Sequence, residues 1–240
     1  MIKVYNSQQE ASEAMAEEFK NIANQSIKER GRFNVSLTGG SSPKVLYKLL
    51  AEKPLVDQIP WDKTFVFWGD ERCVPFDHED NNAKMAFDLL LDKVPLPKDN
   101  TFRMDGRSNP SEGAQEYERI LKQHFKNEDP AFDLILLGMG GDGHTASIFP
   151  GTEVINEKDK WVDTGYNAEL KSDRITLTAP FINKARNIFF GAFGEGKAET
   201  LKSVIEGDYR PSEYPSQLIN TEQGNLVWYL DEPAAKQIKH

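Results

Sequence analysis

Cysteine is almost absent from this chain, since Cys73 is the single one among 240 residues. One thiol excludes a disulfide within the chain and a zinc site built from several cysteines. Histidine is scarce as well, with four in the sequence. No two of them stand at i and i+4, and neither an H-E-x-x-H motif nor a calcium-binding EF-hand loop is present. The sequence therefore predicts no metal site.

Basic residues are also in deficit, with 29 Lys and Arg against 38 Asp and Glu and a formal net charge of -9. This balance argues against nucleic acid as a partner, because binding to a phosphate backbone relies on a basic face. A small anion can still bind where a few cations and backbone N–H groups converge. The charge therefore restricts an anionic ligand to one local, positively charged site.

Long apolar segments are missing too, so the sequence predicts no membrane span. The first residues, "MIKVYNSQQEAS", lack the basic-then-apolar build of a signal peptide. We expect a cytoplasmic protein that does not bind membranes. The sequence leaves open whether it is a monomer or a small homo-oligomer.

What the chain does contain is a regular alternation of apolar runs and amphipathic helices, with no internal repeat or linker, which predicts a single domain over 1–240. The expected strands lie in 2–5, 33–40, 64–72, 132–139, 187–194 and 225–231. The expected helices follow Ser7 and lie in 41–50, 81–91, 110–125 and 196–207, with a short one at the C-terminus. This order predicts an α/β fold with three α/β/α layers and a mostly parallel, Rossmann-like sheet.

Polar motifs follow four of the expected strands, after "SLT", "VFW", "LILLGM" and "FFGAF". In parallel sheets of this kind, ligands bind beyond the carboxyl ends of the strands. We therefore expect these four motifs to meet in one active site.

The first motif is "TGGSSPK". Gly39 and Gly40 permit a tight turn with exposed N–H groups, and Ser41 and Ser42 add hydroxyl donors. Ser42 is the candidate N-cap of the next helix, with Pro43 at its first position. Such a terminus attracts anions, but an ordinary strand-to-helix turn has the same sequence. The motif is not a Walker loop, because its spacing differs.

The second motif, "WGDERCVP", places Asp70 and Arg72 at a strand end. Arg72 could stabilise negative charge that develops during a reaction, although a surface salt-bridge cluster explains the same residues. Cys73 is interpreted as a small buried thiol rather than a nucleophile.

The third motif, "GMGGDGHTAS", gives the strongest indication of a functional site. Gly140 and Gly141 permit close approach of a ligand, and Asp142 flanks His144, which can act as a general base near neutral pH. The alternative is a structural or solvated histidine. A dinucleotide site is disfavoured because the G-x-G-x-x-G spacing is absent.

Two later cations complete the set. Arg174 begins "RITLTAPFINKA", and Lys197 lies in "FGEGKAET" at a helix start, where a phosphate could bind. Each could equally be a solvated side chain. The negative net charge favours a cationic cluster if the ligand is an anion.

Taken in order, the segments "SLTGGSSPKVLY", "WGDERCVPFDHEDNN", "LILLGMGGDGHTASIFPGT", "RITLTAPFINKA" and "GAFGEGKAETL" resemble the 6-phosphogluconolactonase family over nearly the whole chain. That family shares its fold with the glucosamine-6-phosphate deaminases and isomerases. The deaminases carry a glutamate where this chain has Phe149, and they favour "DEY" where this chain has "DER". Both differences favour the lactonase.

The resemblance implies hydrolysis of 6-phosphoglucono-1,5-lactone to 6-phosphogluconate in the pentose phosphate pathway, without metal or organic cofactor. It implies that His144 activates water and that Asp142 orients the imidazole of His144. It also implies that Arg72, with Asp70 nearby, lines the end of the site that holds the sugar. The residues expected to receive the 6-phosphate are Arg174, Lys197 and the turn at Ser41 and Ser42, and we also expect Gly39, Gly40, Gly140 and Gly141 to contact substrate. The alternatives are a deaminase or isomerase of amino-sugar phosphates and a non-catalytic sugar-phosphate sensor.

Overall fold

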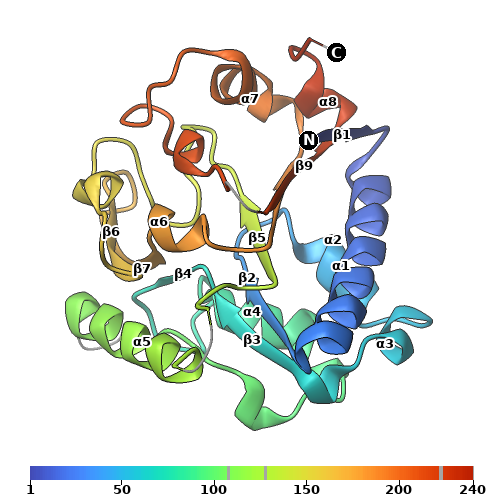
Figure 1. Ribbon diagram of the computed structural model, residues 1–240. Helices are drawn as coiled ribbons and strands as arrows, with labels where there is room; N and C mark the ends of the chain where they lie inside the picture. Colours follow the sequence, from blue (N-terminus) through green and yellow to red (C-terminus); the bar gives the residue numbers. More distant parts are fainter. Residues whose placement is uncertain (107–108, 127–128, 222–223, 240) are drawn as a thin grey trace.

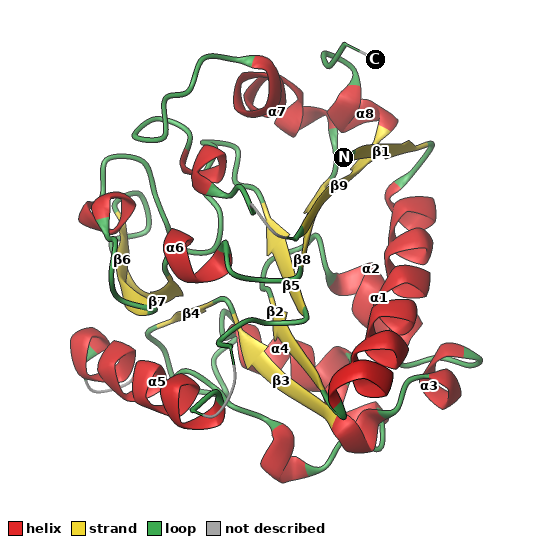
Figure 2. Ribbon diagram, viewed as in Figure 1, coloured by secondary structure: helices red, strands yellow, loops and turns green. Residues whose placement is uncertain are grey.

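A parallel sheet forms the centre of the molecule. The computed structural model describes residues 1–106, 109–126, 129–221 and 224–239, and within them six strands join in the order β1-β9-β8-β5-β2-β3 (Figures 1 and 2). Every pairing in this sheet is parallel. The strands are β1 (Ile2–Tyr5), β2 (Phe33–Leu37), β3 (Thr64–Trp68), β5 (Leu134–Gly138), β8 (Asn187–Ala192) and β9 (Asn225–Asp231). The predicted α/β fold with a parallel sheet is confirmed.

Helices cover both faces of this sheet. The structure places α1 (Gln8–Arg30), α2 (Lys44–Leu50), α3 (Leu55–Gln58), α4 (Asn82–Leu89), α5 (Pro110–His124), α6 (Ala179–Ile182), α7 (Ala198–Glu206) and α8 (Glu232–Ala235). Alternate side chains of β5 enter two apolar cores: Leu134 and Leu136 pack with Phe19 of α1, whereas Ile135 and Leu137 join the core that α5 and α7 cover. This alternation follows from the period of two in a strand and produces the three layers.

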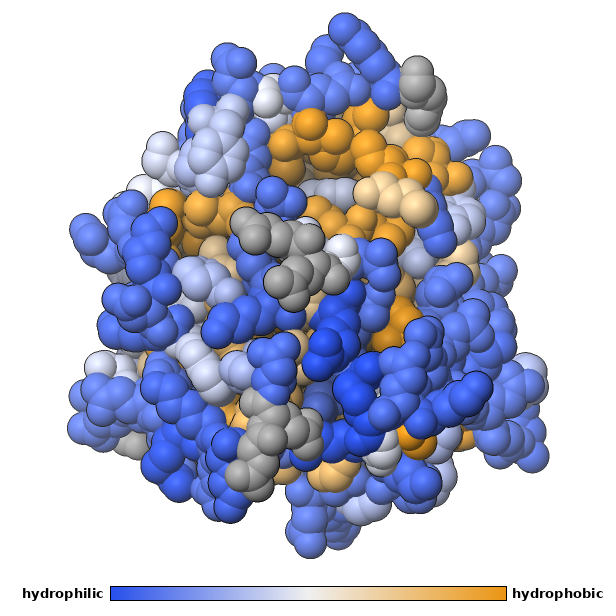
Figure 3. Space-filling view, viewed as in Figure 1, coloured by the Kyte–Doolittle hydropathy of each residue, from blue (hydrophilic) through white to orange (hydrophobic). Residues whose placement is uncertain are grey.

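The outer surface is largely polar. Hydrophilic residues cover most of the face shown in Figure 3, and the mean hydropathy of the chain is -0.60. None of the helices in the described part of the chain combines the length and the apolar character that a membrane crossing needs.

The start of α2 differs from the prediction. Ser42 does not cap it: the helix begins at Lys44, and Pro43 occupies the cap position with φ -82° and ψ -7° and no side-chain hydrogen bond. Pro43 thus already has helical backbone angles, and its ring has no group that could accept a hydrogen bond from the first turn. By contrast, Ser7 caps α1 as expected, because its hydroxyl accepts from the backbone N–H of Glu10 at 3.2 Å.

A second, antiparallel sheet was not foreseen from the sequence. It contains β4 (Asp70–Arg72), β6 (Val162–Asn167) and β7 (Ser172–Leu177) in the order β4-β7-β6. The predicted strand 64–72 divides at Gly69, whose N–H bonds the carbonyl of Leu37 in the large sheet at 2.9 Å. The carbonyl of Gly69 accepts from Leu177 in the small sheet at 2.8 Å. Gly69 thus links the two sheets and turns Asp70 and Arg72 toward the strand ends.

His124, at the end of α5, is enclosed by aromatic rings. The centroid of its ring lies 5.0 to 5.3 Å from those of Phe65, Phe67, Phe102 and Phe125. Its Nε2 lies 2.8 Å from Oδ1 of Asn34. Burial, with a smaller contribution from the charge of Arg32, lowers the pKa of His124 to about 4.

Stability should consequently fall as the pH drops from 7 to 5. Below the ordinary histidine pKa of about 6.5, the unfolded chain binds a proton that folded His124 does not bind until about pH 4. We expect His124 to lower the free energy of unfolding by on the order of 1 kcal/mol between pH 7 and pH 5, after a discount for its partial exposure. Urea unfolding of the wild type and of His124→Gln at pH 7 and pH 5 measures this change in the free energy of unfolding. An equal loss in the two proteins would contradict the assignment.

Candidate active site

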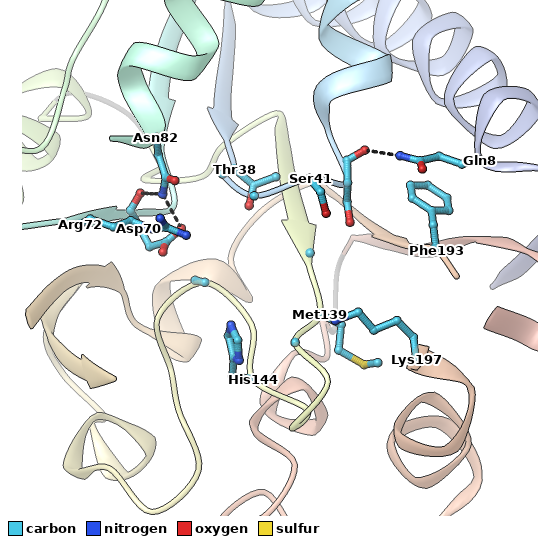
Figure 4. A pocket seen from close by; sticks show the side chains of 16 residues that line it. Gln8, Thr38, Ser41, Asp70, Arg72, Asn82, Met139, His144, Phe193 and Lys197 are labelled. Atoms are coloured by element: carbon cyan, nitrogen blue, oxygen red, sulfur yellow. Dashed lines mark hydrogen bonds between the residues drawn. The ribbon is translucent and has the colours of Figure 1, made fainter. Parts of the chain in front are cut away.

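A cavity of about 260 Å³ opens at the carboxyl ends of the central strands (Figure 4). Its walls come from the segments after β2, β5 and β8 and from β4 and the start of α4. The predicted residues that line it are Gly39, Gly40, Ser41, Ser42, Asp70, Arg72, Gly140, His144 and Lys197. The four polar motifs therefore do meet at one place.

His144 is paired with Asp142. The Nδ1 atom of His144 lies 2.5 Å from Oδ1 of Asp142, and the same oxygen accepts from the His144 backbone N–H at 3.1 Å. Although burial opposes ionisation of Asp142, these bonds and the charge of His144 hold the pKa of Asp142 below its ordinary value. The ionised carboxylate can only accept a hydrogen bond, so the proton of the neutral imidazole lies on Nδ1. Nε2 is therefore the nitrogen with a free lone pair. Asp142 itself stands behind the histidine and does not line the cavity.

Gly140 makes this pair possible. A Cβ on Gly140 would lie 2.1 Å from Nδ1 of His144 and 2.4 Å from Oδ1 of Asp142. The backbone also closes the turn here, because the N–H of Gly140 bonds the carbonyl of His144 at 2.8 Å. Glycine is thus required at this position by the space that the imidazole and carboxylate occupy.

Gly140→Ala is therefore expected to displace the imidazole and to lower kcat by roughly 10²-fold, the penalty for misplacing a catalytic group by about 1 Å. Gly140 has no left-handed φ, so the loss should come from the clash with His144. Steady-state kinetics of the variant measures it. Gly196→Ala is the control, because nothing lies within 4 Å of an added Cβ there. Equal activity of the two variants would contradict this explanation.

Two other segments of the chain contact the turn that carries His144. Gly143 has φ +81°, and a Cβ on it would lie 2.8 Å from the Tyr214 ring. Its carbonyl accepts from the N–H of Ser216 at 2.9 Å. From α7, the hydroxyl of Thr200 donates to the carbonyl of Gly141 at 2.6 Å. Two segments far along the chain thus fix the turn that carries His144.

Arg72, Asp70 and Asn82 form one end of the cavity (Figure 4). Asp70 is 6% exposed, and its Oδ2 accepts from the hydroxyl of Ser147 at 2.7 Å. The Arg72 guanidinium donates from Nη1 to the carbonyl of Asp80 at 3.0 Å. This end therefore presents a cation whose position is fixed by the backbone.

Glu71 faces away from the cavity. Its carboxylate accepts from the backbone N–H groups of Arg72 at 2.8 Å, Asn82 at 2.8 Å and Ala83 at 2.9 Å. Burial raises the pKa of Glu71 to about 7, although the three N–H groups favour the ionised form. Glu71 thus ties β4 to the start of α4.

Lys197 and Ser41 lie toward the other end of the cavity, near Gln8 and Phe193 (Figure 4). Lys197 is the residue that precedes α7, as the sequence predicts. Burial lowers the pKa of Lys197, and the carboxylate of Asp142 partly offsets this. Within the described residues, no acceptor lies within hydrogen-bonding distance of its Nζ. The ammonium is therefore available for a ligand.

Arg174 is not brought to the cavity. It is only 3% exposed and stands opposite Arg72 in the register of β7 and β4. Its guanidinium donates to the Ser172 hydroxyl and to the carbonyl of Asp173. Burial, followed by the charge of Arg72, lowers the pKa of Arg174. The structure thus places Arg174 beside Arg72, at the end of the cavity away from Lys197.

Gly141, a predicted substrate contact, also lies off the cavity wall, and so does Cys73, which the sequence indicates is a buried thiol and not a site residue. Gly141 packs under Lys197, since an added Cβ would lie 4.0 Å from the Lys197 Nζ. Cys73 is partly buried, and burial raises the pKa of its thiol to about 11. A thiol that holds its proton this strongly is a poor nucleophile.

Sequence reasoning did not name all the residues that line the cavity; the others are Gln8, Thr38, Asn82, Gly138, Met139, Ala146 and Phe193. Gln8 belongs to the first turn of α1, and its Nε2 donates to the carbonyl of Ser42 at 3.2 Å. Asn82 begins α4, and Phe193 follows β8. Phe193 did carry a signal, because it lies at the carboxyl end of the expected strand 187–194.

Comparison with known proteins places this site in a family. The family model for glucosamine-6-phosphate isomerases and 6-phosphogluconolactonase matches residues 6–228. The chain belongs to this family. The isomerase and lactonase family includes a 6-phosphogluconolactonase of Synechocystis sp. that is 41% identical over 217 residues, covering 89% of this chain and 88% of the relative.

Solved structures lead to the same family. The 6-phosphogluconolactonase from Trypanosoma cruzi matches with a TM-score of 0.88 and 28% identity over 100% of this chain and 97% of the other. A monomeric glucosamine-6-phosphate deaminase has a TM-score of 0.83 at 17% identity, covering 98% and 99% of the two chains, which shows the shared fold alone. The family resemblance predicted from the motifs is thereby confirmed.

Phe149 packs against His144. Its ring centroid lies 4.5 Å from that of His144, and the side chain is buried. The histidine therefore contacts an apolar ring at the position where the resemblance places the glutamate of the deaminases.

Proposed function

We propose that this chain hydrolyses 6-phosphoglucono-1,5-lactone to 6-phosphogluconate in the pentose phosphate pathway. The observation that carries the proposal is the cavity itself, in which His144, oriented by Asp142, lies between the cation Arg72 and the separate cation Lys197. Such an arrangement suits a substrate with an ester at one end and a phosphate at the other. The lactonase relatives support this substrate over others of the family.

In the proposed mechanism, Nε2 of His144 accepts a proton from water as the water oxygen attacks the lactone carbonyl carbon. The carbonyl oxygen becomes an oxyanion, which the guanidinium of Arg72 stabilises. When the tetrahedral intermediate collapses, the bond from the carbonyl carbon to the ring oxygen breaks. The imidazolium returns its proton to that oxygen, which becomes the C5 hydroxyl of 6-phosphogluconate. Asp142 holds the tautomer and stabilises the imidazolium.

For the 6-phosphate, we propose contacts with the Lys197 ammonium, the Ser41 and Ser42 hydroxyls and the backbone of Gly39 and Gly40. Tyr47 supports that turn, because its hydroxyl accepts from the N–H of Thr38 at 3.0 Å and donates to its carbonyl at 2.7 Å. A charge-assisted bond to phosphate at a site remote from the carbonyl lowers the barrier by fixing the geometry. Arg174 is assigned here to the support of Arg72, because it does not reach the cavity.

Two other functions fit this site less well. An amino-sugar phosphate deaminase or isomerase is disfavoured by Phe149, which supplies no carboxylate to the imidazole. A sugar-phosphate sensor is disfavoured by the His144–Asp142 pair, which ligand binding alone does not require.

We further propose that residues 1–240 act as one domain, as a monomer or small homo-oligomer in the cytoplasm, without nucleic acid or membrane partners. No group of three or more metal-ligating side chains occurs among the described residues. The proposed mechanism uses only side chains of this chain and water.

The experiment follows the disappearance of lactone made freshly by oxidation of glucose 6-phosphate, after subtraction of spontaneous hydrolysis. We expect acceleration by the protein and no ammonia from glucosamine 6-phosphate. Ammonia release without lactone hydrolysis would reverse the assignment. Tight binding of the sugar phosphates with neither reaction would favour the sensor.

A further inference from the structure

The Asn82 side chain presents an unpaired oxygen to the cavity. The side chain is only 3% exposed, yet it lines the cavity wall. Its Nδ2 donates to the Asp70 backbone carbonyl at 3.0 Å and approaches the Asp70 carboxylate Oδ1 at 3.5 Å. Both partners are acceptors, so the NH₂ group must face Asp70 and the amide oxygen must face away from it. Within the part of the chain that the structure describes, no donor bonds Oδ1.

This oxygen is held rigidly. The N–H of Asn82 donates to the carboxylate of Glu71 at 2.8 Å, and the side chain lies over Gly39, where an added Cβ would be 1.8 Å from Oδ1. Figure 4 shows the side chain at the same end of the cavity as Asp70 and Arg72. Because Asn82 lines the cavity, its oxygen can take a donor from water or from a bound ligand. The arrangement therefore points to a donor on the substrate.

We propose that Asn82 is a specificity-determining residue whose Oδ1 accepts a hydrogen bond from the C2 hydroxyl of the lactone. The inference rests on the proposed function, which sets the carbonyl carbon between His144 and Arg72. The neighbouring C2 then carries the hydroxyl nearest to that end. Asp70 is less suited to accept this bond, because its Oδ2 is occupied by Ser147 and its Oδ1 is approached by Asn82.

The test compares the parent lactone with the 2-deoxy lactone, which is made by oxidation of 2-deoxyglucose 6-phosphate. The quantity measured is the ratio of kcat/KM for the two lactones, divided by the ratio of their spontaneous hydrolysis rates. In the wild type we expect a corrected ratio on the order of ten, the effect of one neutral hydrogen bond in a buried site. A wild-type ratio near one would overturn the proposal without any variant.

Asn82→Ala is expected to lower kcat/KM for the parent lactone by about tenfold and to leave that for the 2-deoxy lactone nearly unchanged, because the deoxy substrate has no bond to lose. A merely structural role would lower both values by the same factor, and that result would also overturn the proposal. The intrinsic reactivity of the two lactones cancels in this comparison.

Asn81→Ala is the matched control. The Asn81 side chain caps α4 by accepting from the N–H of Lys84 at 2.8 Å and does not line the cavity. This variant should keep the wild-type discrimination even if it loses stability. The proposed lactonase function is tested separately, by hydrolysis of the parent lactone with the wild type. The role of Asn82 is tested by the discrimination between the two lactones, so each proposal can fail without the other.

Discussion

Replacement of His144 by alanine is expected to lower kcat for the lactone by about 10²–10⁴-fold, the usual contribution of a general base. The imidazole is positioned by one side-chain bond of 2.5 Å to Asp142, and no phosphate contact is assigned to it. Binding should therefore change little, and KM should stay close to the wild-type value. Initial rates over a range of lactone concentrations, with spontaneous hydrolysis subtracted, separate kcat from KM.

Asp142→Asn supplies a graded comparison, since it keeps the shape of the partner and removes its charge. We expect a loss smaller than that of His144→Ala, because an amide can still bond Nδ1 but no longer stabilises the imidazolium. Circular dichroism should show both variants folded. Wild-type turnover by a folded His144→Ala protein would remove the assigned base and with it the proposed mechanism.

Replacement of Lys197 by alanine should lower kcat/KM for the phosphorylated lactone by roughly 10–100-fold, as expected when a hydrogen bond to a charged group is lost from a partly buried site. The ammonium has no acceptor among the described residues, so the variant leaves no buried partner unpaired. Burial already lowers the pKa of Lys197, and a bound phosphate dianion should raise it again.

Unphosphorylated glucono-1,5-lactone provides the internal control for Lys197. Because it has no phosphate to bind, wild type and Lys197→Ala should hydrolyse it at similar rates. Lys202 is an exposed lysine on α7, the helix that Lys197 precedes, and Lys202→Ala should leave both substrates unaffected. If Lys197→Ala slowed both lactones equally, the lysine would act on the reaction centre and the phosphate end would have to be reassigned.

The large sheet was predictable because its strands are short segments rich in apolar residues that are followed by turn signals, as in Leu134–Gly138. The small sheet was not. Its strand β4 has three residues, all charged, and β6 contains Gly165 among polar residues. β4 forms because it pairs with the distant β7, and β6 forms because it pairs with β7 in a hairpin. Their strand structure depends on this pairing more than on local propensity.

The predicted site residues that line the cavity share one property: they follow strands of the parallel sheet that the sequence reveals. Asn82 and Gln8 reach the cavity through helix packing, and no spacing in the sequence signals this. Arg174 illustrates the opposite error. Its sequence resembles a motif of the family, but only the antiparallel register with β4 shows that it stands beside Arg72.

The backing of the His144 turn by Tyr214 and Ser216 has a consequence for how this protein would lose its activity. The segment that holds Gly143 packs on the outside of the molecule, and its Arg210 and Glu213 are about half exposed. Local opening of such a surface segment requires less free energy than global unfolding. On gentle heating, turnover should therefore decline while the central sheet is still intact, so catalytic lifetime is set by a peripheral stretch that never touches the substrate.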